Sequence, residues 1–173
     1  MKRVALIIQY DGSCYSGWQK QENAISVQGV LEKTLHEITN RPVKTFAAGR
    51  TDAGVHASGQ VAHFDIDCVI PGNHFKSLLN GHLSQSIRIL ESVEVANNWH
   101  ACYSAIYRHY RYVINNSKIP NLFLNNWTWH RYQKVLDEVS MSYALKGMEG
   151  KHDFFAFQKS GSNRSNSITT IKN

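Results

Sequence analysis

One carboxylate, Asp52, lies in the stretch AAGRTDAGVHASGQVAHF, which covers residues 47–64. Arg50 and Thr51 precede it directly. A carboxylate in a closed site shifts toward its neutral form unless cations or hydrogen-bond donors keep it ionised, and these two neighbours can supply both. An aspartate in a solvated turn needs no such neighbours, although Thr-Asp-Ala-Gly alone also suits an Asx turn that serves only the backbone. We therefore take Asp52 as the candidate catalytic group, with a turn residue as the alternative.

Residue types that commonly bind metals are scattered along the chain. Three histidines without metal-like spacing are interpreted as loop, strand and turn residues: His56, His63 and His100. Three cysteines, an odd number at wide spacing, indicate neither a disulfide framework nor a CxxC zinc site: Cys14, Cys68 and Cys102. This spacing therefore indicates no metal site, and a reducing, cytoplasmic location fits the cysteine content best.

Composition bounds the class of protein. The chain of 173 residues is 42% hydrophobic and 18% charged, which is ordinary for a globular protein and unlike a disordered one. Its length suits one domain, or one and a fraction. No apolar run approaches the ~20 residues that cross a bilayer, and no signal-peptide cleavage pattern follows the N-terminal Met-Lys-Arg. We expect a folded protein without a membrane-spanning segment.

The net charge of +6 is unevenly distributed. Residues 1–100 carry nine Lys and Arg and nine Asp and Glu, whereas residues 101–173 carry ten against four. A basic region of this kind is typical of a surface that binds a polyanion, because Lys and Arg neutralise phosphates and release counterions. A basic solvated face is the alternative.

The first half of the chain has a mixed pattern of strands and helices. Four segments with strand character are residues 4–10, 43–48, 59–66 and 87–95. Ser26 can cap a helix after the first strand, and a short helix with Phe75, Leu78 and Leu79 inward follows Pro71-Gly72. This β-α-β-β-α-β order is the ferredoxin-like arrangement, with helices on one face of a mostly antiparallel sheet. The Asp52 stretch then lies between the second and third strands.

The second half predicts a β-α-β order that ends abruptly. Residues 107–114 read as a strand with Tyr110 and Tyr112 on one face, and residues 131–148 read as a helix. Its apolar stripe predicts core packing: Met141, Ala144, Leu145 and Met148. A strand begins at HDFFAF, residues 152–157, a loop covers residues 158–167, and a strand begins again at ITTIKN. We therefore expect the second half to be incomplete.

Five strings of the sequence resemble one family in the order in which that family has them: YDGSCYSGWQKQ, SVQGVLE, AGRTDAGVHASGQVAHF, WHACYSAIYRHYRYVI and GKHDFFAF. The chain resembles the tRNA pseudouridine synthase A (TruA) family from Ala5 onward, and GRTDAGVHA is the most specific string. The resemblance implies an α+β fold of two ferredoxin-like halves around a basic RNA-binding cleft. We place the halves at residues 1–97, which carry the Asp52 loop, and 98–173, which are basic, RNA-binding and truncated.

The resemblance also implies an isomerase that converts uridine to pseudouridine in the tRNA anticodon stem–loop, at positions 38–40, without a cofactor or metal. Asp52 is then the catalytic carboxylate, acting either as a nucleophile or as a base on the ribose. Arg50 and Thr51 bind the substrate, and Arg50 helps to hold the flipped nucleotide. Tyr110 matches the family's active-site tyrosine, whose ring stacks on the uracil.

Further expectations concern RNA binding and assembly. Arg108 and Arg111 contact phosphate or solvent, and Trp18 orders a loop beside the cleft. Cys102 stands where the family usually has arginine, a departure that weakens RNA contacts. The family forms homodimers that hold one tRNA, so the resemblance implies self-association.

Two alternatives to the isomerase remain at this point. A truncated or inactive RNA-binding module would keep the same fold and basic face, and the 173-residue chain alone is expected to be inactive because the family's C-terminal part supplies a further active-site arginine. A glycoside hydrolase needs two acidic residues at its site, and the Asp52 stretch up to residue 64 offers one.

Overall fold

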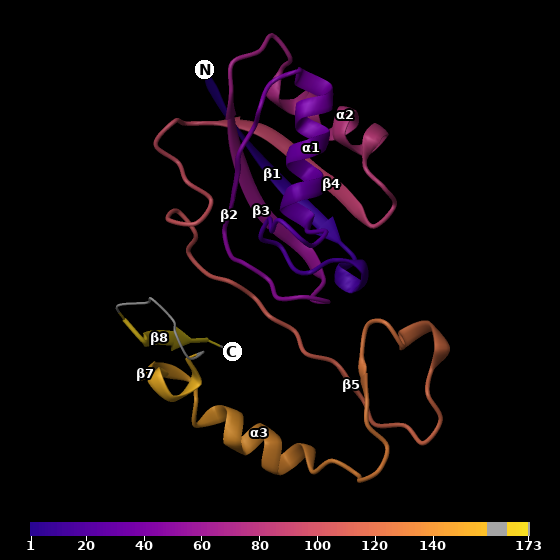
Figure 1. Cartoon of the computed structure of the whole chain (residues 1–173). Coiled ribbons are helices and arrows are strands. Elements are labelled where there is room, and N and C mark those ends of the chain that lie inside the picture. The colour runs from indigo at the N-terminus through magenta and orange to yellow at the C-terminus, as the bar shows by residue number, and fades with distance from the viewer. Residues whose placement is uncertain (159–165, 173) are drawn as a thin grey trace. The chain divides into compact units, whose positions relative to one another are not determined.

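The computed structural model describes residues 1–158 and 166–172, and divides the chain into two compact units, Met1–Tyr110 and Arg111–Asn173 (Figure 1). The first unit therefore extends past the expected boundary at residue 97. Arg3 of the first strand contributes to this extension, because its guanidinium donates hydrogen bonds to the carbonyl oxygens of Asn97 and Trp99, at 2.7 and 2.6 Å.

The first unit contains one four-stranded sheet and two helices. Its elements in chain order are β1 (Lys2–Tyr10), α1 (Val27–Thr39), β2 (Thr45–Ala47), β3 (Ala57–Ile66), α2 (Phe75–His82) and β4 (Ile87–Val95), with 3₁₀ turns at Gly12–Cys14 and Gly72–His74. The strand order is β2-β3-β1-β4, and all neighbouring strands are antiparallel. The β-α-β-β-α-β order predicted for the first half is confirmed.

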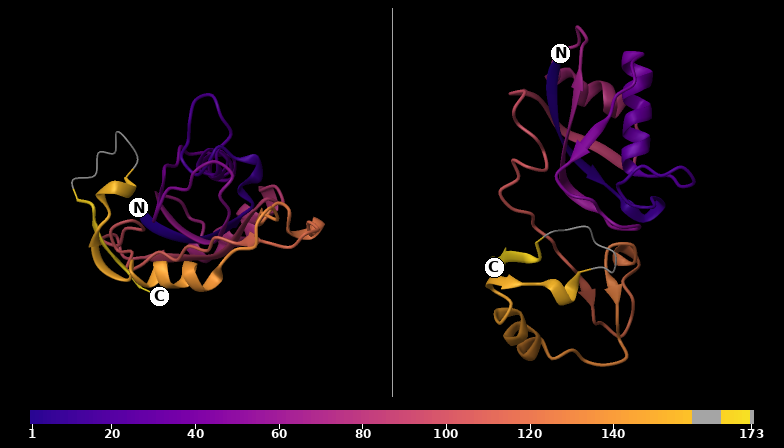
Figure 2. Two further views of the ribbon diagram at one scale, coloured as in Figure 1. Left: turned by 90° about the horizontal axis from the view of Figure 1, so that it is seen from below. Right: turned by 60° about the vertical axis from the view of Figure 1, so that its left-hand side comes forward.

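The core lies between the sheet and its helices, which cover the same face of the sheet in Figure 1 and in the right-hand view of Figure 2. The predicted strand over residues 4–10 is confirmed as part of β1, and one of its faces is buried, because Val4, Leu6, Ile8 and Tyr10 are at most 2% exposed. Leu31 and other apolar residues of the helices belong to the same cluster. Fully burying a side chain of this size contributes about 1.5–3 kcal/mol, so this face fixes the register of β1.

Hydrogen bonds of two capping residues, Ser26 and Asn40, mark the two ends of helix α1. The Ser26 side chain accepts a hydrogen bond from the Gly29 N–H at 3.2 Å, which confirms the predicted N-cap. Asn40 ends the helix at a positive φ of 52°, and its N–H donates to the His36 carbonyl oxygen. After α1 the chain continues into β2 and then into the Asp52 stretch.

The second unit is built from short elements: β5 (Ile114–Asn115), β6 (Trp129–His130), α3 (Glu138–Lys146), β7 (Gly150–Asp153) and β8 (Ile168–Ile171), with 3₁₀ turns at Leu122–Leu124 and Phe155–Phe157. Strands β5 and β6 pair in parallel, and β7 pairs with β8 in antiparallel orientation. None of its described residues is buried. The hydrophobic core of the described residues therefore lies in the first unit.

The predicted strand over residues 107–114 is wrong except at its last residue. No regular structure forms from residue 105 to residue 113, and β5 begins only at Ile114. A strand needs a paired neighbour, and β6 offers only two residues for pairing. Tyr110 and Tyr112 therefore do not share a strand face.

The predicted helix over residues 131–148 is shorter than expected, because Asp137 caps α3 by accepting a hydrogen bond from the Ser140 N–H at 3.0 Å. Its stripe is not packed in a core. Met141 is 41% and Leu145 is 62% exposed, so the predicted burial is wrong. A 3.6-residue period shows which residues share a face and not what covers that face.

The strand predicted at HDFFAF also ends early. β7 ends at Asp153, whose carboxylate accepts a hydrogen bond from the Phe155 N–H at 2.9 Å and starts a 3₁₀ turn. The predicted loop over residues 158–167 falls largely on residues 159–165, outside the described residues, and the strand predicted at ITTIKN is confirmed as β8 over four residues. No helix among residues 1–158 and 166–172 is long and apolar enough to span a bilayer.

Candidate active site

Residues 48–56, called the Asp52 turn below, connect β2 to β3. The Asp52 carbonyl oxygen accepts a hydrogen bond from the Val55 N–H at 3.2 Å. Gly54 has a φ of +78°, a conformation that glycine adopts without steric cost. The Asp52 side chain is exposed at the tip of this turn. Residues 48–56 therefore form a tight turn, and the carboxylate of Asp52 at its tip is exposed to solvent.

The sheet holds the Asp52 turn on both sides of Arg50. The Tyr10 hydroxyl, at the end of β1, lies 2.8 Å from the Thr51 hydroxyl. The Gln60 side-chain amide, in β3, donates to the Gly49 carbonyl oxygen at 2.7 Å. Burial raises the pKa of the Tyr10 phenol, and hydrogen bonds with Thr51 and Gln60 oppose that rise. The Tyr10 hydroxyl is therefore protonated near neutral pH and can donate a hydrogen bond.

The segment between β1 and α1 lies against the Asp52 turn. The Trp18 N–H donates to the Thr51 carbonyl oxygen at 3.0 Å, and the Gly54 N–H donates to the Tyr15 carbonyl oxygen at 3.2 Å. Gly17 has a φ of +89°, and a Cβ on it would lie 2.5 Å from the Thr51 carbonyl oxygen. Only glycine permits this close approach of two backbones.

The first turns of α1 hold this segment in place. The Val27 and Gln28 N–H groups donate to the carbonyl oxygens of Gly17 and Trp18, at 3.2 and 3.0 Å. These are N-terminal amides that have no partner within the helix. The start of α1 therefore holds the segment that contains Gly17 and Trp18, and this segment holds the Asp52 turn. The backbone of Trp18 connects the two, because its carbonyl oxygen accepts from α1 and its N–H donates to Thr51.

Two of the family-like strings meet at the far end of the turn. The Gly12 N–H donates to Nδ1 of His56 at 3.1 Å, and the Asp11 carboxylate lies 3.1 Å from the same nitrogen. Hydrogen bonds from Ser13, followed by the charge of His56, lower the pKa of Asp11. A Cβ on Gly12 would lie 2.1 Å from the Val55 carbonyl oxygen. The YDG and GVH strings therefore form one packed unit.

The polar groups of the candidate site are only partly paired. Arg50 and Asp52 are both exposed, and no ion pair joins them among residues 1–158 and 166–172. Thr51 is half-buried and is held at both its hydroxyl and its carbonyl oxygen. The structure thus rigidifies the backbone beneath Asp52 and leaves the two charged side chains open to solvent.

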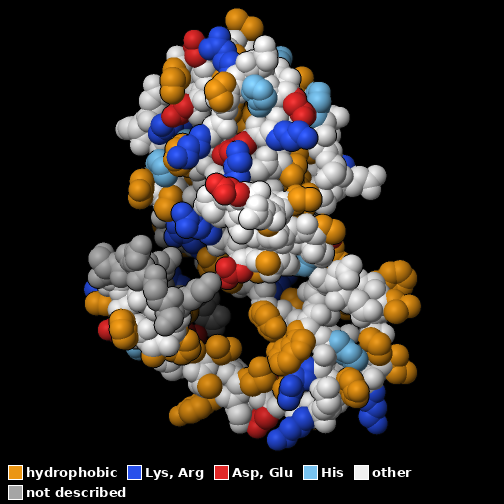
Figure 3. All heavy atoms as spheres, viewed as in Figure 1, with side chains coloured by type: hydrophobic (Ala, Val, Ile, Leu, Met, Phe, Trp, Pro, Cys, Tyr) orange, Lys and Arg blue, Asp and Glu red, His pale blue; other side chains and the backbone are white. Residues whose placement is uncertain are grey.

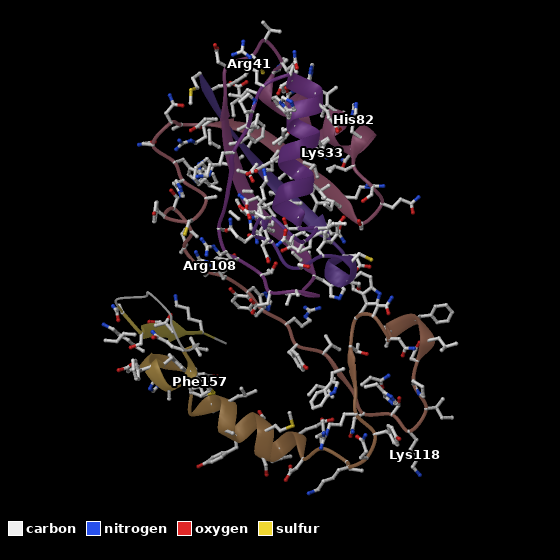
Figure 4. All side chains as sticks on the ribbon, viewed as in Figure 1. Lys33, Arg41, His82, Arg108, Lys118 and Phe157 are labelled. Atoms are coloured by element: carbon white, nitrogen blue, oxygen red, sulfur yellow. The ribbon has the colours of Figure 1, made fainter. Side chains whose placement is uncertain are left out.

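Arg108 lies against the beginning of the turn (Figure 4). Its Nε and Nη2 atoms donate to the Ala48 carbonyl oxygen at 3.0 and 2.5 Å, and Nη2 lies 3.9 Å from the Cys102 sulfur. The guanidinium remains exposed. Arg108 therefore joins the residues around Asp52, with a structural contact that the sequence did not indicate.

Among the described residues, no hydrogen bond joins the other two predicted residues, Tyr110 and Arg111, to the turn. Tyr110 is 73% exposed, and no hydrogen bond joins it to Asp52 in the described part of the chain. Arg111 is exposed and belongs to the second unit. Tyr112, in the same unit, packs its ring edgewise on Trp129 at 6.4 Å.

Another acidic residue of the family-like strings, Glu32, has a structural role. Its Oε1 accepts hydrogen bonds from the Thr45 N–H at 2.9 Å and from the Gln28 side-chain amide at 3.0 Å, and Lys20 lies 3.4 Å from its Oε2. These contacts join α1 to β2. Within the described ranges, no group of three or more His, Cys, Asp or Glu side chains could hold a metal ion.

Charge is mixed over the face shown in Figure 3, where Lys and Arg side chains of the first unit stand among Asp and Glu side chains. This agrees with the equal numbers of acidic and basic residues in residues 1–100. Sequence reasoning did not find Tyr10, Gln60, Gly12 or Gly17 as supports of the turn. The strings YDG and YSGW contained three of them, but no spacing rule places them against residues 48–56.

Comparison with known proteins matches this architecture to one family. The family model described as tRNA pseudouridine synthase matches residues 6–104, which include the whole Asp52 turn. A tRNA pseudouridine synthase A of Prochlorococcus marinus (strain AS9601) is 76% identical over 173 residues, covering 100% of this chain and 65% of the relative. One of Synechococcus sp. (strain CC9902) is 56% identical, covering 99% of this chain and 58% of the relative. The chain thus spans about 65% or less of the length of these curated relatives. Because the family model matches more than half of the chain, the chain belongs to the tRNA pseudouridine synthase family.

Proposed function

We propose that this chain carries the catalytic carboxylate of an enzyme that converts uridine to pseudouridine in tRNA, and that this carboxylate is Asp52. The observation that carries the proposal is the Asp52 turn: one exposed carboxylate on a backbone held at Gly49, Thr51 and Gly54 by three separate parts of the fold. Family membership and relatives that bear the name tRNA pseudouridine synthase A support it.

The reaction demands little besides such a carboxylate. The bond between C1′ and N1 of uridine breaks, the uracil rotates, and a bond forms between C1′ and C5. The proton lost from C5 is balanced by a proton gained at N1, so nothing is oxidised or reduced. A carboxylate positioned beside the sugar and the base can act either as the nucleophile or as the base on the ribose. Closure of the site around the nucleotide would exclude water from the exposed Asp52.

Other residues take roles around Asp52 in this proposal. Arg50, adjacent on the same turn, holds the flipped nucleotide, whose extraction from the stem costs a few kcal/mol. Thr51 contributes its backbone to the substrate site, and Tyr110 stacks on the uracil. Arg108 and Arg111 neutralise phosphates of the RNA, in line with the basic excess after residue 100.

The finer features of the proposal follow from the family resemblance. We propose the anticodon stem–loop, at positions 38–40, as the target, a basic cleft formed with a second ferredoxin-like half, a homodimer as the assembly and the cytoplasm as the location. The AS9601 relative is longer than this chain, which covers 65% of it, and the described residues of the second unit have no buried core.

The test is the substitution Asp52→Asn, which is nearly isosteric and removes charge and basicity. It is made in the extended chain, defined as this chain joined to the portion of the AS9601 relative that it does not cover. We expect release of tritium from C5 of tRNA uridine to fall to background while tRNA affinity stays within about threefold, because one exposed charge has a modest effect on binding. Asp67→Asn is the control, since Asp67 is also an exposed aspartate and lies at the other end of β3, outside the turn.

One alternative function keeps a specific observation in its favour. Because no described ion pair holds the Asp52 carboxylate, the chain could serve as a non-catalytic RNA-binding module. Tritium release from the unsubstituted extended chain decides between the two: tRNA binding without isomerisation would favour the binding module and contradict the proposal.

A further inference from the structure

We infer that Tyr10 is a positioning residue for Asp52 and acts through Thr51; this inference rests on the proposed function. Tyr10 ends β1 and is 2% exposed, so sheet pairing and burial fix its ring. It pairs with Ala57 on one side and Ile87 on the other. Its ring centroid lies 6.1 Å from that of Trp18. Few rotamers remain for a side chain held in this way.

The contact between Tyr10 and Thr51 sets the orientation of the next peptide group. Thr51 is held at two points, its hydroxyl by Tyr10 at 2.8 Å and its carbonyl oxygen by the Trp18 N–H at 3.0 Å. That carbonyl belongs to the peptide that joins Thr51 to Asp52. Because Thr51 is held at these two points, the peptide between Thr51 and Asp52 is restricted in its rotation. The positions of Cα and Cβ of Asp52 therefore depend on the contact that Tyr10 of β1 makes with Thr51.

The hydroxyl of Tyr10 serves the turn and not the core. The ring fills core space, and the phenyl ring of Phe would fill the same space. The hydroxyl lies 2.8 Å from the Thr51 hydroxyl. Gln60, in β3, holds the Gly49 carbonyl oxygen on the other side of Arg50. Tyr10 and Gln60 thereby hold the two residues that flank Arg50.

The magnitude of the effect follows from the precision that catalysis needs. A displacement of ~1 Å in a reacting group can lower a rate by about 100-fold. Loss of one hydrogen bond, with the Trp18 contact retained, loosens the turn without releasing it. We therefore expect Tyr10→Phe to lower kcat by about 10-fold to 100-fold in the extended chain, while KM and the Kd for tRNA change by less than about threefold.

Tyr15→Phe is the matched control. Tyr15 is also nearly buried, at 8% exposed, and its hydroxyl lies 2.6 Å from the Ser86 hydroxyl. The two substitutions each remove one hydroxyl-to-hydroxyl contact from the same unit. The Tyr10 hydroxyl contacts the Asp52 turn, whereas Tyr15 contacts the turn through its carbonyl oxygen, which Tyr15→Phe keeps. A general loss of stability would therefore lower kcat equally in both variants, whereas positioning lowers it only in Tyr10→Phe.

A double-mutant cycle tests whether Tyr10 acts through Thr51. Thr51→Val removes the hydroxyl with little change of shape, and Thr51→Ser keeps it. We expect Tyr10→Phe combined with Thr51→Val to have the kcat of Thr51→Val alone within about twofold, because both remove the same contact. Multiplicative losses of kcat would overturn the inference.

Amide hydrogen exchange supplies a readout that does not depend on activity. In the 173-residue chain we expect faster exchange at residues 50–55 in Tyr10→Phe than in the unsubstituted chain and in Tyr15→Phe. Equal exchange in all three, or an unchanged kcat in Tyr10→Phe, would overturn the inference. If the unsubstituted extended chain forms no pseudouridine, the proposed function fails, and the exchange result alone then decides whether Tyr10 holds the turn.

Discussion

His63 makes the stability of the first unit depend on pH. It is 1% exposed on β3, and its Nδ1 accepts a hydrogen bond from the Ala101 N–H at 3.2 Å. Burial, followed by the charges of Arg3 and His100, lowers the pKa of His63 to about 4, and the charge of Asp65 opposes this change. Protonation would turn the acceptor Nδ1 into a donor that faces another donor.

The magnitude follows from the two pKa values. The pKa of His63 is about 4 in the folded chain, against 6.5 when unperturbed. The unfolded chain therefore binds the proton more readily, and stability is fully present above pH 6.5 and falls as the pH drops toward 4. Linkage gives a loss of about 2 kcal/mol between pH 7.5 and pH 5, and a limit of about 3 kcal/mol below pH 4.

The assay is urea unfolding of the 173-residue chain at pH 7.5 and pH 5, followed by far-UV circular dichroism. His63→Asn should remove most of the pH dependence, because an Asn side-chain oxygen can take the position of Nδ1 and does not titrate. His109→Asn, a change at an exposed histidine, should leave it intact.

Two results would refute this reasoning about His63. One is a free energy of unfolding that is equal at pH 7.5 and pH 5 in the unsubstituted chain. The other is a loss of stability in His63→Asn as large as in the unsubstituted chain. The carboxylates with lowered pKa values in this unit, Asp11, Asp65 and Glu94, lose their stabilising effect mainly below pH 5, so they do not obscure the comparison.

Two further predictions concern the turn and the RNA. Gly17→Ala should destabilise the chain by about 2 kcal/mol or more in the same urea assay, because Gly17 has a positive φ and lies close to the Thr51 carbonyl oxygen. Gly81→Ala, within α2 and with open space around it, should be neutral or stabilising. Equal effects of the two substitutions would contradict this account of Gly17. Binding of the extended chain to tRNA should weaken steeply with salt, and Arg111→Ala should lower the log–log slope by about 0.7–0.9 if this residue contacts a phosphate. Arg108→Ala should also speed amide exchange at the Asp52 turn, because Arg108 holds the Ala48 carbonyl oxygen; a salt-independent affinity would contradict the basic surface.

The sequence alone determined most of the first unit. The strand character of residues 4–10 identified β1, and its buried residues Val4, Leu6 and Ile8 alternate along it, as a period of two requires. The Ser26 cap identified the start of α1, because the cap is a contact over three residues. The order of the elements through β4 followed from such local signals, and so did the place of Asp52 between two strands.

Local signals were insufficient after residue 104. The tyrosine-rich stretch 107–114 has a strand-like composition, yet a strand forms only where another backbone pairs with it, and β5 is paired over two residues. The stripe that includes Met141 and Leu145 marks a helix face, but no described element buries it. Both failures have the same cause, because pairing and burial depend on partners that are distant in sequence.

Only the tertiary structure decided how the Asp52 turn is held. The sequence separation between Tyr10 and Thr51 is 41 residues, and their hydroxyls meet at 2.8 Å because β1 and β3 are adjacent in the sheet. Gly17 reaches the Thr51 carbonyl oxygen because the N-terminal amides of α1 hold the segment before it. The sequence thus identified the carboxylate, since its neighbours in the chain make it distinctive, whereas its supports depend on contacts that exist only after the sheet has formed.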